Sequence, residues 1–131
     1  MTAPRHWSRH PVLSAILGVF AGMLTIALIE WVGHKAMGTA NAPEPAKASS
    51  AMFGLVLIAW LAGAAVSAWV AGRWNASGRP TAGVCAALVL WAATGLTLWM
   101  VPHPIWAAAA ALLLMPAAGW LAATRAAKAG A

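Results

Sequence analysis

Four long runs of apolar residues dominate the pattern of hydrophobic and polar positions along the chain. We expect membrane spans over about residues 12–37, 50–72, 81–101 and 104–124. At 1.5 Å per residue, a helix of about 20 residues crosses the roughly 30 Å hydrocarbon core of a bilayer. The pattern therefore predicts an all-α integral membrane bundle of four antiparallel transmembrane helices, which forms a single domain over residues 1–131.

Short polar segments separate these runs. The longest is the linker at residues 38–50, where Ser49 or Ser50 can cap the next helix. The segment at residues 101–104 is so short that the third and fourth spans must be antiparallel neighbours. Pro116 is expected to kink the fourth span, with its freed backbone groups bonded by neighbouring helices.

The composition also indicates a membrane protein. Hydrophobic residues make up 63% of the chain and charged residues only 8%, whereas soluble domains have about 25% charged residues. The net charge of +6 comes from basic residues spread in pairs, so we expect the lipid bilayer, with its anionic headgroups, and no nucleic acid as a partner. The single cysteine, Cys85, is interpreted as a small apolar residue of the third span.

The distribution of basic residues predicts the orientation. Lys and Arg are enriched in cytoplasmic loops. On the outer side the chain has only Lys35 and Lys47, while six basic residues lie on the side of both termini: Arg5, Arg9, Arg73, Arg79, Arg125 and Lys128. We therefore expect a multi-pass protein with cytoplasmic N- and C-termini. Four spans with such short loops are typical of a bacterial inner (cytoplasmic) membrane protein.

Small residues recur on one face of each of the first two spans. A small-x-x-x-small spacing lets helix backbones approach closely in lipid. We expect the first two spans to pack through six such residues, in preference to a homodimer contact: Gly18, Gly22, Gly33, Ala59, Gly63 and Ser67.

Polar and aromatic side chains gather where the spans should reach the outer side of the membrane. The candidate outer-face site consists of Glu30, Trp31, His34, Trp99, His103 and Trp106. An ionisable residue inside a span is a functional hypothesis by default, whereas Trp at both interfaces is the ordinary aromatic belt. The residues do not identify a cofactor.

Catalytic motifs are not found in the sequence. It has no nucleophile–base arrangement, no Gly-rich phosphate loop and only two acidic residues, so we expect no enzymatic activity. The leading hypothesis is an accessory or structural subunit of a membrane assembly, bound to another membrane protein or to its own copies. One alternative is a small oligomeric transporter or channel with Glu30 and His34 at its outer mouth. Another is metal or tetrapyrrole binding through His34 and His103.

Short motifs along most of the chain resemble a known group of proteins. They are Gly33-His34, the small-residue face of the second span, and Pro102-x-Pro104-x-Trp106 followed by the residues from Met115 to Leu121. These stretches are similar to small four-span bacterial inner-membrane proteins of a family without an assigned activity. The resemblance implies a four-span bundle and no particular mechanism.

Overall fold

Four helices make up the fold. The computed structural model describes residues 10–38, 49–75 and 77–130, and within this part of the chain it contains helices and no strands. The helices are α1 (Pro11–Ala36), α2 (Ser50–Trp74), α3 (Thr81–Met100) and α4 (Ile105–Gly130). The predicted all-α class is confirmed. The helix bounds lie close to the predicted spans, except that α4 continues beyond 124 to Gly130.

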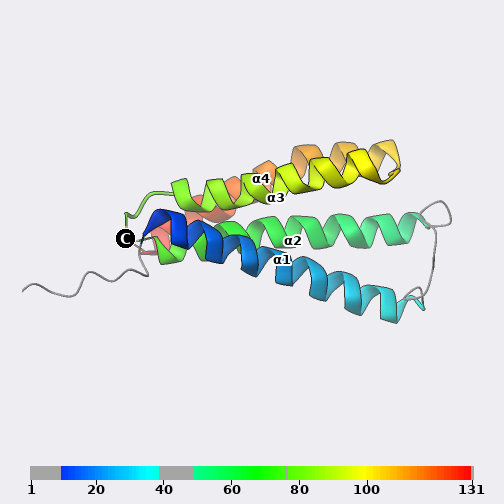
Figure 1. Ribbon diagram of the computed structural model, residues 1–131, viewed down its shortest axis with the longest axis horizontal. Helices are drawn as coiled ribbons and strands as arrows, with labels where there is room; N and C mark the ends of the chain where they lie inside the picture. The colour runs from blue at the N-terminus through cyan, green and yellow to red at the C-terminus, as the bar shows by residue number, and fades with distance from the viewer. Residues whose placement is uncertain (1–9, 39–48, 76, 131) are drawn as a thin grey trace, which may run out of the picture.

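All four helices are long and apolar enough to cross a membrane. They lie lengthwise beside one another, so that the end of α1, the start of α2 and the α3–α4 connection share one end of the molecule (Figure 1). The start of α1, the α2–α3 connection and the end of α4 share the other end. The protein is thus described as a multi-pass transmembrane bundle. The end that carries the α3–α4 connection is called the connection end.

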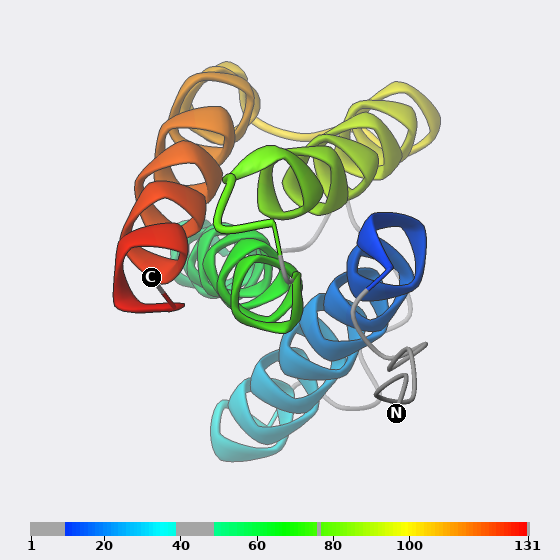
Figure 2. The same cartoon turned by 90° about the vertical axis from the view of Figure 1, so that its left-hand side faces the viewer.

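Helices α2 and α3 each contact all three other helices, and α2 is the centre of the bundle because its contacts with α1 and α4 are the most extensive. An end-on view shows α4 on one flank of α2 and α1 on another (Figure 2). Toward the connection end, α1 stays beside α2 but diverges from α3 and α4 (Figure 1).

Small residues allow α1 and α2 to pack with their backbones close together. A Cβ atom added at Gly22 would lie 2.7 Å from the Gly63 carbonyl oxygen and 2.8 Å from Ser67 Cβ. At Gly18 it would collide with the Ser67 carbonyl oxygen, and Ala59 is completely buried on α2. Since lipid provides no hydrophobic driving force between helices, such close van der Waals contact is what holds α1 on α2.

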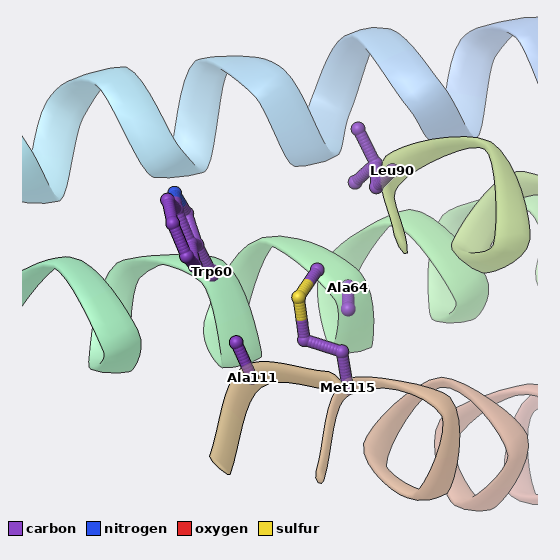
Figure 3. Close-up of a cluster of buried hydrophobic side chains, with 5 residues drawn as sticks. All are labelled: Trp60, Ala64, Leu90, Ala111 and Met115. Carbon is purple, nitrogen blue, oxygen red and sulfur yellow. The ribbon is translucent and has the colours of Figure 1, made fainter. Parts of the chain in front are cut away.

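The contacts of α3 and α4 follow the same rule. A Cβ atom at Gly83 would lie 2.5 Å from the Ala68 carbonyl oxygen, and one at Gly119 would lie 2.5 Å from Ala87 Cβ. At the centre of the bundle, side chains from three helices form a buried apolar cluster. It consists of Trp60, Ala64, Leu90, Ala111 and Met115 (Figure 3).

Pro116 lies inside α4, which continues on both sides of it. Because proline has no N–H, the carbonyl of Leu112, four residues earlier, loses its helical partner. The indole Nε1–H of Trp91 on α3 donates to this carbonyl oxygen at 3.1 Å. The expectation that a neighbouring helix bonds the freed backbone group is confirmed at this carbonyl.

The helix ends use local caps. Ser49 is the N-cap of α2, and its hydroxyl accepts from the backbone N–H of Met52 at 3.3 Å. Between α2 and α3, the Asn75 side-chain amide donates to Ser77 Oγ and to the Arg79 carbonyl oxygen, at 2.7 and 3.2 Å. Gly78 in this turn has φ +65°, a left-handed conformation that suits glycine. The turn is therefore tightly fixed by its own hydrogen bonds.

Candidate functional site

The six residues of the predicted outer-face site lie toward one end of the molecule. Glu30, Trp31 and His34 occupy the last two turns of α1, and Trp99 lies in the last turn of α3. His103 belongs to the α3–α4 connection and Trp106 to the first turn of α4. In an antiparallel bundle these positions share the connection end. Helix α1 diverges from α3 and α4 at this end (Figure 1).

Glu30 lines a cleft between α1 and α3. The cleft has a volume of about 310 Å³, which is at the lower end of the range for small-molecule sites. Helix α2 contributes Trp60, and the residues on the two facing helices are Val19, Met23, Ile26, Ala27 and Glu30 of α1 with Val89, Leu90, Ala93, Thr94 and Thr97 of α3.

The cleft extends from the connection end toward the middle of the bundle. Glu30 follows Val19 by 11 residues, which corresponds to about 17 Å along the axis of α1 at 1.5 Å per residue. Between these two residues the wall of the cleft is almost entirely apolar. A carboxyl group at one end of an apolar cleft favours an amphipathic occupant over a uniformly polar one.

Trp60 connects this cleft to His103. The ring centroids of His103 and Trp60 lie 5.5 Å apart, and those of His103 and Phe53 lie 5.4 Å apart. The Nδ1 atom of His103 lies 2.7 Å from the Val101 carbonyl oxygen, so a proton on Nδ1 can be donated to that oxygen. His103 therefore packs against two aromatic side chains of α2 in the α3–α4 connection.

The other members of the predicted site are arranged along the surface of this end. His34 is half-buried on α1, one helical turn beyond Glu30. The Lys35 ammonium lies 5.4 Å from the ring centroid of Trp31, a cation–π contact. Trp99 and Trp106 are exposed, as expected for indoles of an interfacial belt. Of the six, Glu30 is the one that lines the cleft.

Metal binding was one of the possibilities raised by the two histidines. Among residues 10–38, 49–75 and 77–130, no three His, Cys, Asp or Glu side chains lie close enough together to hold a metal ion. Trp60 lines the same cleft as Glu30, and its ring also packs against that of His103.

Sequence reasoning did not select Trp60, Thr94 or Thr97 as site residues. Trp60 has the appearance of a core residue because it lies near the middle of an apolar helix and is 7% exposed. Thr94 and Thr97 are three residues apart, so they share a face of α3. This spacing is a signal in the sequence that could have placed both threonines beside α1.

A second cavity, of about 400 Å³, lies between the same two helices toward the other end. Its lining residues are apolar side chains together with Thr81 and Cys85, and it shares Val19 and Val89 with the cleft at Glu30. Cys85 is therefore exposed to a cavity between helices, where the sequence had placed only an apolar residue of the span.

The chain was compared with protein-family models, with curated proteins and with solved structures, and none of them matches it. Functional conclusions consequently depend on the geometry described above.

Proposed function

We propose that the protein is a non-enzymatic accessory or structural subunit of a membrane assembly, bound to another membrane protein or to its own copies. The observation that carries the proposal is the outward face of α1. This helix is the least buried of the four. It presents a row of large apolar side chains with one-face spacing, each about 60–70% exposed: Phe20, Leu24, Leu28 and Trp31.

The packing of α1 supports this assignment. One side of α1 is held tightly on α2 through Gly18 and Gly22. Its last turns diverge from α3 and α4, which leaves the opposite side without a neighbour in the bundle (Figure 2). In lipid, helices associate through van der Waals packing, so a second helix on this face would supply the contacts that α1 lacks within its own bundle.

The location proposed is the bacterial inner membrane, with both termini in the cytoplasm. Arg73, Arg79, Arg125 and Lys128 belong to one end of the bundle, and Lys35 belongs to the other. An excess of Lys and Arg is typical of the cytoplasmic side, so this distribution supports an inward-facing α2–α3 connection.

The test is native mass spectrometry of the protein extracted from its own membrane in mild detergent. A complex heavier than the 13.4 kDa chain and containing a second protein is the expected result. Leu24→Ala with Leu28→Ala should weaken the complex, whereas Leu113→Ala, on a residue of α4 that is 73% exposed, should not. A bare monomer from membranes extracted in several mild detergents would contradict the proposal.

A second candidate is a small transporter or channel that works as an oligomer, with Glu30 and His34 at its outer mouth. The observation in its favour is that Glu30 lines the cleft together with Trp60. If this function is correct, Glu30→Gln should abolish uptake or resistance in cells, because it removes the charge and keeps the shape. A homo-oligomer in the mass spectrum would favour this candidate. Unchanged phenotypes in both Glu30→Gln and His34→Ala would exclude it.

A further inference from the structure

The two cavities between α1 and α3 adjoin each other and are together called the groove. Val19 and Val89 line both, so the apolar wall continues from the cleft at Glu30 toward Pro11 and Thr81. Among the described residues that line it, Glu30 is the one with an ionisable carboxyl group. The groove therefore has an acidic site near the connection end and apolar walls elsewhere.

An indole lies at the acidic end of the groove. Trp60 stands up from α2 toward α1, with its ring nitrogen at the end nearer to α1 (Figure 3). Indole rings are the best side-chain partners for cations, and quaternary ammonium groups are commonly recognised by aromatic side chains. Thr94 and Thr97 line the facing wall on α3. Carboxyl and indole together favour a positively charged group.

The preference for a cation comes from Glu30 and not from the rest of the chain, which is net positive. The protein has a net charge of +6 and only two acidic residues, one of which is Glu30. A charged group inside a span is costly unless it is paired or functional. An anionic ligand would be repelled by an ionised Glu30, while a cationic ligand would neutralise it.

We propose that this groove binds a single-chain organic cation. Its ammonium group lies at Glu30 and Trp60, and its apolar chain follows α1 and α3 toward Val19 and Val89. The distance from Glu30 to Val19, about 17 Å, is close to half of a roughly 30 Å hydrocarbon core. The bound chain would thus run parallel to the lipid tails of one leaflet. This site does not depend on the protein being an assembly subunit.

The test uses the full-length protein in phosphatidylcholine nanodiscs and radiolabelled decyltrimethylammonium as the probe. Equilibrium dialysis against empty nanodiscs separates binding to the protein from partition into lipid. Saturable binding is expected, and unlabelled decanol, which has the same chain without the charge, should not compete. Glu30→Gln should weaken binding at least about tenfold because it removes the Coulombic attraction between the carboxylate and the quaternary ammonium group. Glu44→Gln, which changes the net charge equally, should not.

Neighbouring alanines of α3 provide a matched steric pair. Ala92 and Ala93 are both exposed, but only Ala93 lines the cleft. Ala93→Phe should fill the cleft and weaken binding at least about tenfold, whereas Ala92→Phe should leave it within about twofold. Circular dichroism of each variant checks that the helices are intact. If Glu30→Gln does not fold, the alanine pair decides the question.

Three results would contradict the proposal that the groove binds an organic cation. They are binding no greater than that of empty nanodiscs, unchanged affinity in a folded Glu30→Gln, or the same effect of Ala92→Phe and Ala93→Phe. The mass spectrum of the extracted complex is independent of these measurements, so the binding site and the subunit function can fail separately.

Discussion

Single methyl groups have large effects where two helix backbones approach each other. At Gly22 an added Cβ would lie 2.5 Å from Leu90 Cδ1 as well as within 3 Å of atoms on α2. The leucine side chain can move, but the Gly63 carbonyl oxygen belongs to a helix backbone and cannot. By contrast, a Cβ atom at Gly95 on α3 would meet nothing within 4 Å. Of the two glycines, Gly22 is therefore the one whose small size is required by the packing of its neighbours.

We accordingly expect opposite effects from the two alanine substitutions. Gly22→Ala should lower the free energy of unfolding by about 1–3 kcal/mol, because α1 must shift away from α2. Gly95→Ala should leave it unchanged or raise it by up to about 1 kcal/mol, because alanine favours the helix. Unfolding in mixed detergent micelles, followed by circular dichroism, measures both. Equal effects of the two substitutions would contradict the close contact at Gly22.

The pairing of α3 with α4 contains a polar link inside the membrane. Pro116 leaves the Leu112 carbonyl without its helical donor, and the Trp91 indole supplies one from the neighbouring helix. Backbone groups in hydrocarbon have no water to bond, so an unpaired carbonyl would be costly there. Trp91 and Pro116 thus form a pair whose energetic contributions are coupled.

This coupling can be measured with a double-mutant cycle. Trp91→Phe should destabilise the protein by about 1–3 kcal/mol, because it leaves the Leu112 carbonyl unpaired. In the Pro116→Ala background the same change should cost clearly less, since an alanine at this position restores the backbone N–H. Detergent-induced unfolding of the four proteins gives the interaction energy. Additive effects would show that the Trp91 hydrogen bond does not compensate for the proline.

Much of the element structure could be predicted from the sequence, for identifiable reasons. Apolar runs of span length specify the helices, and Ser49 is a recognisable N-cap. The small residues of α1 and α2, including Gly22 and Gly63, do face each other. Small-residue spacing identifies a face that is suited to close packing with a neighbouring helix.

The arrangement of the whole bundle was less accessible to sequence reasoning. A periodic pattern defines helix faces but not how far two helices diverge along their length, which depends on side chains from both partners. The separation of α1 from α3 creates the cleft, and so its residues on α3 and α2 were missed (Figure 1). Glu30 was found because a carboxyl group inside an apolar run stands out, whereas Trp60 resembles any buried aromatic residue.

The orientation of the molecule in its membrane can be tested with single cysteines. The native Cys85 is first replaced by alanine, since it is exposed to a cavity. Met37→Cys then marks the connection end of the bundle and Ala129→Cys the opposite end; both positions are exposed at helix ends. A membrane-impermeant maleimide added to spheroplasts should label Met37→Cys at once and Ala129→Cys only after permeabilisation.

The physical basis of this expectation is the asymmetry of basic residues. Arg73, Arg79 and Lys128 all belong to the end near Ala129, and the Arg73 guanidinium donates to the Ala129 carbonyl oxygen. Positive charges close to span ends are retained on the cytoplasmic side. The opposite labelling pattern would place both termini outside. Glu30 and the connection end would then face the cytoplasm, and any cation in the groove would enter from that side.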